Sequence, residues 1–372
     1  MRPGRWLMAG ALGSLGLALL LGGTLCLSSG CSSVGYLARS AQGHLSLLGA
    51  ARPVDQWLAD EATPAPLKER LALSQRIRDY ASQELSLPDN RSYRAYADIG
   101  RPAAVWNVVA APELSLTLKT WCFPVVGCVS YRGHFEQDRA EAEAAALRAE
   151  GWEASAYAVP AYSTLGWSEW VGGDPLLSSF IQWPEGELAR LIFHELSHQV
   201  AYAEGDTVFN ESYATAVERL GGERWLATRA SEAARAQYAA FDQRRRELRE
   251  ITLAARQRLQ AVYAGPGPDE DKRRAKAEAM AAMREAVEQA KRERWGGYAG
   301  FDAYVARLNN ATLGVQGAYL DRVPAFEALF EREGRSFARF HAAVRRLAAL
   351  PHAERDAALD ALAPLASRAA SP

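Results

Sequence analysis

Residues 184–200 read Pro-Glu-Gly-Glu-Leu-Ala-Arg-Leu-Ile-Phe-His-Glu-Leu-Ser-His-Gln-Val, and this stretch decides the fold. Pro184 with Glu185 and Glu187 behind it is typical of the first turn of a helix. On that helix His194 and His198 lie one turn apart and project from the same face. Four aliphatic residues occupy the opposite face at helical spacing: Leu188, Ile192, Leu196 and Val200. The sequence therefore predicts a helix that is buried on one side and carries two imidazoles on the other.

The pattern His-Glu-Leu-Ser-His at residues 194–198 is a zinc-binding motif with a defined mechanism. Two imidazoles one turn apart can bind one zinc ion, and Glu195 points about 100° round the helix from His194. At that angle its carboxylate can take a proton from an activated water without being a ligand. The motif arises by chance in about one chain per hundred of this length, so a structural role for the two His without metal is the alternative.

A catalytic zinc needs a third protein ligand, and Glu211 is the candidate. It stands in Phe209-Asn-Glu-Ser-Tyr-Ala214, thirteen positions after His198. This gap allows a connecting loop with Gly205 and a second helix that brings the carboxylate back over the motif. Asp206 is the competing third ligand. Glu211 could also be an ordinary acidic residue near a helix N-terminus.

The first thirty residues are typical of an export signal. Arg2 and Arg5 precede residues 6–27, which contain no charged side chain. The run ends in Leu-Ser-Ser-Gly-Cys31, which resembles a lipobox, so we expect Cys31 to be lipid-modified. The alternative is that residues 6–27 stay as an uncleaved membrane span. Either reading places the rest of the chain in the cell envelope, on the periplasmic side, with a lipid anchor in the outer membrane as the default.

Cysteine use is consistent with export. Of the four Cys, Cys26 would leave with the signal and Cys31 would carry the lipid. Cys122 and Cys128 remain, and an oxidising compartment predicts a disulfide between them. Two reduced, buried thiols are the alternative.

The overall composition excludes two classes of protein. A hydrophobic fraction of 49% is too high for a disordered chain. The 43 basic and 44 acidic side chains give a net charge of −1, so nucleic-acid binding is not expected. Residues 244–246 are three consecutive Arg, but Glu247 and Glu250 offset them, and a solvated helix face explains this cluster.

The chain divides into three zones. Residues 32–90 show helical periodicity, residues 91–170 mix short β-prone runs with one helix, and nearly everything from Pro184 onward is helical. Residues 225–295 predict a long antiparallel helical hairpin that turns at Gly-Pro-Gly-Pro, residues 265–268. We expect an α+β, mainly helical fold in which residues 31–372 form one metallopeptidase domain and the hairpin is an appendage.

The zinc motif followed by Asn210-Glu211-x-Tyr213-Ala214 resembles the gluzincin metallopeptidases. The chain after residue 30 is similar to a bacterial family of predicted aminopeptidases, many of them lipoproteins. The matching segments are 31–36, 119–133, 161–167, 174–180, 194–198, 308–311 and 319–326. The resemblance implies a zincin-like core, Glu211 as third ligand and aminopeptidase activity. The gap before Glu211 is shorter than in thermolysin-like members.

Weaker patterns predict residues for substrate binding and for oxyanion stabilisation. Residues 156–165 are placed to form an edge strand that pairs with extended substrate, although an ordinary strand explains them equally well. An oxyanion donor is needed, and the resemblance favours Tyr319, with Tyr213 and Tyr162 behind it. Acidic groups for a substrate amine would come from Glu169, Asp174 or Glu185. His134 lies far from the motif, and a structural imidazole is expected there.

The sequence therefore predicts a zinc-dependent peptidase with Zn²⁺ on His194, His198 and Glu211, and with Glu195 as general base. Its substrate would be a peptide or protein, and aminopeptidase activity is the first expectation. Two alternatives stay open: an envelope endopeptidase, and a non-catalytic lipid-anchored scaffold with a structural zinc.

Overall fold

The structure is a computed structural model that describes residues 31–123, 127–161 and 173–362. The chain up to Ala50 and the chain from Ala51 onward are two separate compact units. In the first, the described residues form one helix, α2 (Cys31–Ala50). No helix among the described residues has the length and apolar character needed to cross a bilayer. The predicted export signal, residues 1–30, lies outside the described part.

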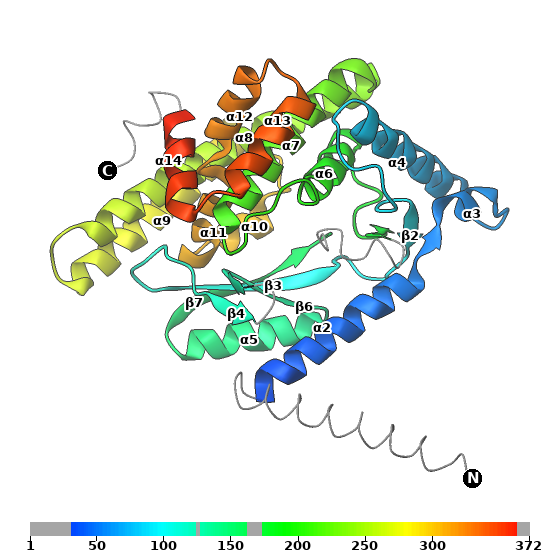
Figure 1. The fold of residues 1–372 in the computed structure, drawn as a ribbon. Helices are drawn as coiled ribbons and strands as arrows, with labels where there is room; N and C mark the ends of the chain where they lie inside the picture. Colours follow the sequence, from blue (N-terminus) through cyan, green and yellow to red (C-terminus); the bar gives the residue numbers. More distant parts are fainter. Residues whose placement is uncertain (1–30, 124–126, 162–172, 363–372) are drawn as a thin grey trace, which may run out of the picture. The chain divides into compact units, whose positions relative to one another are not determined.

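The second unit is mainly helical, with three small sheets in its described part (Figure 1). The predicted fold class, α+β and mainly helical, is confirmed. Its helices are α3 (Val54–Ala59), α4 (Ala65–Gln83), α5 (Gln137–Ala149), α6 (Glu185–Ser197), α7 (Thr207–Thr228), α8 (Glu232–Ala264), α9 (Asp269–Glu293), α10 (Asp302–Ala306), α11 (Asn310–Leu320), α12 (Val323–Arg332), α13 (Phe337–Ala348) and α14 (His352–Leu362). Its strands are β1 (Arg52–Pro53), β2 (Ala95–Ala97), β3 (Val105–Pro112), β4 (Trp121–Phe123), β5 (Gly127–Val129), β6 (Arg132–His134), β7 (Trp152–Val159) and β8 (Leu176–Leu177).

The main sheet has the order β6-β3-β7, with both outer strands antiparallel to β3. Residues 105–111 of β3 are all buried, as expected for a strand covered on both faces. Helix α5 packs its small residues Ala140 and Ala144 on one face, and Ala311 of α11 packs on the other. Among the described strands β7 lies at an edge of this sheet. The strand predicted at 156–165 ends at Val159, and most of the remaining stretch lies outside the described residues.

Helices α6 and α7 form a closely packed antiparallel pair. Trp225 near the end of α7 donates to Glu185 at the start of α6, with 3.0 Å between the indole nitrogen and the carboxylate oxygen. Gly221 and Gly222 allow this approach, because a Cβ at Gly221 would lie 2.7 Å from Leu85 and 3.0 Å from Phe193. Tyr80 of α4 covers the same end through ring contacts with Phe193 and Trp225. The pair is therefore fixed on several sides.

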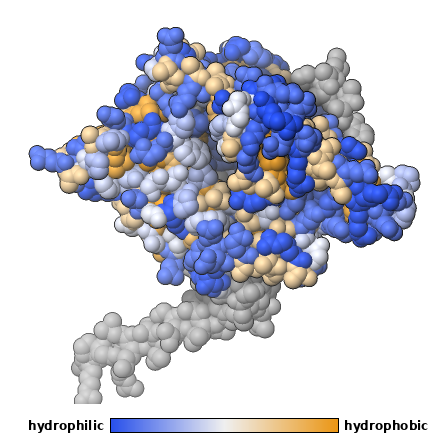
Figure 2. All heavy atoms as spheres, turned by 180° about the vertical axis from the view of Figure 1, so that it is seen from behind, coloured by the Kyte–Doolittle hydropathy of each residue, from blue (hydrophilic) through white to orange (hydrophobic). Residues whose placement is uncertain are grey.

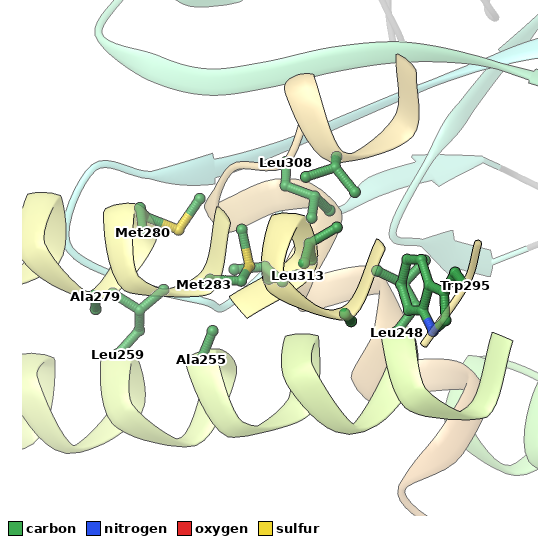
Figure 3. Close-up of a cluster of buried hydrophobic side chains, with 12 residues drawn as sticks. Leu248, Ala255, Leu259, Ala279, Met280, Met283, Trp295, Leu308 and Leu313 are labelled. Carbon is green, nitrogen blue, oxygen red and sulfur yellow. The ribbon is translucent and has the colours of Figure 1, made fainter. Parts of the chain in front are cut away.

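Helices α8 and α9 form the expected hairpin around residues 265–268. Figure 3 shows Ala255 and Leu259 on the side of α8 toward α9, with Ala279, Met280 and Met283 of α9 in the same buried cluster. Trp295, Leu308 and Leu313 complete this cluster, so the hairpin shares its core with the segment that leads into α11. The predicted range of 225–295 also contains the last turn of α7, and the first helix of the hairpin begins at Glu232.

Candidate metal centre

Three of the predicted site residues converge on one point. His194 Nε2 lies 3.3 Å from His198 Nε2 and 3.3 Å from Glu211 Oε2, and His198 Nε2 lies 3.8 Å from the same oxygen. Two nitrogens bound to one tetrahedral zinc at about 2.0–2.1 Å are about 3.3–3.4 Å apart. The three side chains are nearly buried, and no fourth His, Cys, Asp or Glu of the described residues joins them. The donor set and its spacing therefore fit a zinc ion.

The segment between α6 and α7 positions Glu211 through its polar side chains. Asn210 accepts from the Ala203 nitrogen and donates to the Ala203 oxygen, both at 2.8 Å. Asp206 accepts from the Phe209 nitrogen at 2.9 Å and is the N-cap of α7. Because these contacts close the loop on itself, a short connection is enough to turn the chain back. Glu211, in the second turn of α7, then faces the end of α6.

Asp206, the competing third ligand, has a different role in the structure. Its second carboxylate oxygen lies 2.8 Å from the buried Arg355 guanidinium. One oxygen thus caps α7 and the other is held in an ion pair. The structure brings Glu211, and not Asp206, to the two imidazoles.

Glu218 is a site residue that the sequence analysis missed. Its Oε2 lies 3.1 Å from Nδ1 of His194, and its Oε1 accepts from buried Arg190. Burial opposes the charged carboxylate, but the charges of Arg190 and His194 outweigh it and lower the pKa of Glu218 to about 2. A carboxylate on the second nitrogen of a ligating imidazole orients the ring and raises its basicity. Glu218 lies two turns after Glu211 on one face of α7, a spacing that could have revealed it.

The two imidazoles are electrostatically different. Burial disfavours the charged form of His194, but hydrogen bonds to Glu211 and Glu218 outweigh it and raise its pKa well above the usual value. Burial lowers the pKa of His198 to about 4. The carboxylates of Glu211 and Glu218 therefore favour one positive charge at His194, and a bound cation would supply that charge and replace the proton on the ring. His198 is already neutral, as a metal ligand must be.

Glu195 is buried beside these residues without being one of the three converging ligands. Burial raises its pKa to about 7; the charge of His194 works against this increase, and the charge of Glu211 adds to it. A carboxyl group with a pKa near 7 can both accept and return a proton at neutral pH.

Of the three tyrosines predicted as oxyanion donors, the structure describes the side chain of Tyr213 alone, so the prediction of Tyr319 stays untested. Tyr319 belongs to α11, but its side chain lies outside the described part, as does the whole of Tyr162. Tyr213 is fully buried and its hydroxyl is 2.8 Å from Nδ1 of His341, so it does not face the site. Tyr131 was missed: burial raises its pKa, and the charges of Glu211 and Glu195 add to the increase. The charges of both carboxylates therefore act on the Tyr131 hydroxyl.

The acidic residues considered for binding a substrate amine lie in different places. Glu185 accepts from Trp225 at the far end of α6, and Glu169 is outside the described part. Asp174 is buried and its charge acts on Glu195. His134 is 2.7 Å from a carboxylate oxygen of Glu143, which suits a structural imidazole.

The two remaining cysteines lie opposite one another. Strands β4 and β5 pair Cys122 with Cys128, and their sulfur atoms are at bonding distance in a disulfide. Residues 124–126 of this turn are outside the described part.

A family model described as "Putative aminopeptidase" matches residues 35–359. The match covers both helix pairs, the main sheet and all three converging side chains. No curated protein and no solved structure matches the chain.

Proposed function

The chain belongs to this aminopeptidase family, and from that premise we propose that it is a zinc-dependent peptidase, with removal of N-terminal residues as its first expected activity. One observation carries the zinc-dependent part of the proposal. The Nε2 atoms of His194 and His198 and the Oε2 atom of Glu211 converge at 3.3–3.8 Å in a buried site. Two imidazoles and one carboxylate are a recognised catalytic ligand set for zinc.

In this mechanism the ligands would be His194, His198 and Glu211, and Glu218 would fix the His194 ring through Nδ1. When bound, zinc supplies Lewis-acid chemistry: it polarises a carbonyl group and makes a water molecule more acidic. Glu195 takes the proton from the attacking water and later gives it to the leaving amine. The Tyr131 hydroxyl is the candidate donor to the carbonyl oxygen, because it is buried and protonated and the charges of Glu211 and Glu195 both act on it.

A non-catalytic scaffold with a structural zinc is the alternative from another class. Such sites are generally closed by a fourth protein ligand, and none is present among the described residues. A structural site also has no use for a buried, non-ligating carboxyl group such as Glu195. An endopeptidase would use the same three ligands and the same base, so product analysis must separate it from an aminopeptidase.

The test is metal content and peptide hydrolysis on the purified chain. We expect one zinc per chain and cleavage of a peptide library, with products read by mass spectrometry. Glu195→Gln should keep the zinc and lose activity by a factor of about 10²–10⁴. Glu223→Gln is the control, because Glu223 is an exposed carboxyl on the neighbouring helix α7 and is not one of the converging residues. Equal rates for parent and Glu195→Gln would refute the mechanism, and inert protein with full zinc would favour the scaffold.

We also propose that the chain is exported and anchored through a lipid on Cys31. The bonded pair Cys122–Cys128 supports this location, because disulfides persist in oxidising compartments. Cells fed a labelled fatty acid should label the parent protein and not Cys31→Ser. Incorporation into both would contradict the anchor.

A further inference from the structure

A cavity of about 510 Å³ lies between the edge strand β7 and helices α8, α10 and α11. Figure 1 shows these elements on the side of the main sheet opposite α5. The β7 part of its wall is residues 155–158, and the α11 part includes Val315 and Gln316. The three metal ligands and Glu195 do not line it. The cavity is thus a separate site, which the proposed mechanism does not use.

The charges around this cavity have one sign. Three arginines line it, Arg245, Arg249 and Arg307, and no Asp or Glu is among the described lining residues. Arg245 is already paired with Glu187 and Asp242. Neither Arg249 nor Arg307 forms an ion pair with any carboxylate that the structure describes. Two guanidinium groups therefore remain available to an anion.

Arg249 is the stronger indication of an anion site, because its side chain is partly buried whereas that of Arg307 is exposed. Burial lowers the pKa of Arg249, the like charges of Arg219 and Arg190 lower it further, and the more weakly acting charges of Glu218 and Asp242 offset this only in part. A cation in such a place is costly unless an anion joins it. Its planar guanidinium can bind a carboxylate through two parallel hydrogen bonds.

Two routes connect the cavity to the metal centre. On the α8 side, Arg245 and Arg190 both donate to the Tyr238 hydroxyl, and Arg190 pairs with Glu218, the partner of His194. On the β7 side, burial raises the pKa of the lining residue Tyr157 to about 12, and the charge of Glu211 contributes to this increase. The wall of the cavity is therefore connected to the residues that hold the metal ligands.

We propose that this cavity is a substrate subsite that binds a carboxylate of the peptide, with Arg249 and Arg307 as its anion-binding residues. The inference rests on the proposed peptidase function and deepens it by naming a substrate class. The carboxylate is either the free C-terminus of a short peptide or an Asp or Glu side chain of a longer one.

The rest of the lining fits a peptide better than an inorganic anion. Leu248, Phe301 and Val315 supply apolar contacts around the charged groups. Tyr304 is one of four exposed large hydrophobic side chains among the described residues, the others being Leu45, Tyr202 and Val208. The face shown in Figure 2 mixes hydrophilic and hydrophobic residues, so apolar exposure alone does not define a site. The apolar lining together with two arginines that form no described ion pair favours a ligand with both apolar and anionic parts.

The experiment measures peptide binding by calorimetry to the full chain carrying Glu195→Gln, in which turnover is expected to be about 10²–10⁴ times slower. One pair of probes is Ala-Leu-Phe with a free carboxylate and with a C-terminal amide. The second pair is Ala-Asp-Phe-amide and Ala-Asn-Phe-amide. We expect the acid of at least one pair to bind more tightly than its neutral partner, and which pair does so identifies the source of the carboxylate.

Adding Arg249→Met should weaken binding of that acid about tenfold or more and leave the neutral probe unchanged. Arg249→Lys should recover part of the difference. Arg258→Met is the matched control, because Arg258 is exposed on the same helix and does not line the cavity. Arg307 is also exposed, so Arg307→Met should fold normally. It tests the cavity if thermal unfolding shows that Arg249→Met is unstable.

Equal binding of acid and neutral probes, or a preference that survives both Arg249→Met and Arg307→Met, would overturn the inference. These outcomes are independent of the proposed function. If the parent protein hydrolyses peptides but shows no carboxylate preference, the peptidase proposal stands and the subsite proposal is wrong. If the zinc-loaded parent shows arginine-dependent binding but cleaves no peptide, the subsite proposal stands and the peptidase proposal is wrong.

Discussion

Two helix pairs in this protein use the same helical spacing for opposite purposes. The α6–α7 pair buries several polar and charged side chains among its apolar ones, including Arg190, His194, His198 and Asn210. The cluster buried between α8 and α9 is apolar: Leu248, Ala255, Leu259, Ala279, Met280, Met283, Val287 and Ala290. The first pair depends on specific partners at fixed distances, whereas the second depends on the area that it removes from water.

The difference indicates how each pair should respond to substitution. A buried hydrogen-bonded network fails when one member is removed, because the remaining charge has lost its partner. An apolar interface loses contacts in proportion to the volume removed and tolerates changes of equal volume. Four measurements test this contrast, from the largest expected effect to the smallest.

Arg190→Met should have the largest effect on folding. It leaves Glu218 buried beside His194 without its cation, which costs about 3–5 kcal/mol of unfolding free energy. Urea unfolding measures the loss. The control is Arg294→Met at the hairpin, whose pair with Glu247 is exposed on the arginine side and contributes about 1 kcal/mol or less. Similar losses in the two variants would mean that the polar pair has no special dependence on its partners.

Leu259→Ala tests the apolar pair. Leu259 is fully buried between α8 and α9, so removing three carbons should cost about 3 kcal/mol. Leu259→Met should cost less than about 1.5 kcal/mol, because the volume is nearly conserved. Both should keep the parental zinc content. Loss of zinc from Leu259→Ala would show that the hairpin core and the metal centre are coupled.

The third measurement is the pH dependence of the unfolding free energy, to which His341, a buried neighbour of α7, contributes. His341 is buried with Nε2 2.8 Å from the Leu85 oxygen and Nδ1 2.8 Å from the Tyr213 hydroxyl. Burial lowers its pKa from 6.5 to about 4, so the folded chain binds fewer protons than the unfolded chain between these values. Its contribution is complete above pH 6.5 and decreases as the pH falls toward 4, by at most about 3 kcal/mol.

Unfolding free energies of parent and His341→Gln, both with chelator present, provide the check for this residue. The difference between the two proteins should shrink as the pH falls from 7 to 4.5. A difference that stays constant over this range would show that His341 does not titrate in the folded state as expected.

Glu218→Gln breaks the same buried pair as Arg190→Met and therefore also lowers the unfolding free energy. The smallest of the four expected effects is its separate effect on zinc binding. The substitution removes the charge that faces Nδ1 of His194 and should weaken zinc binding about 10–100-fold in a competition assay with a chromophoric chelator. Glu327→Gln is a suitable control, since Glu327 pairs with Arg219 away from the ligands. Equal zinc affinity in parent and Glu218→Gln would limit the role of Glu218 to its pair with Arg190.

Much of the candidate site was accessible from the sequence, because its signals are local. His194 and His198 share a helix face by spacing alone, and the Asn-Glu pair on the next helix pointed to Glu211. Glu218 could have been suspected from its place two turns after Glu211, but its pair with Arg190 could not, since an ion pair between helices has no sequence spacing of its own. Tyr131, in the loop between β5 and β6, was missed because no local pattern indicates that the charges of Glu211 and Glu195 act on it.

The sequence by itself determined the helices, the order of the zones, the hairpin turn and the residue types that can hold a metal. These follow from the 3.6-residue period and from Pro and Gly at the turns, which act within a few residues. Only the tertiary structure decided that Asp206 pairs with Arg355 while Glu211 meets the imidazoles, and that Arg249 faces a cavity with no acidic residue in its described lining. Those outcomes depend on how closely separate helices pack. The glycines of α7 and the buried polar contacts together determine this packing distance, and no single segment of the sequence specifies it.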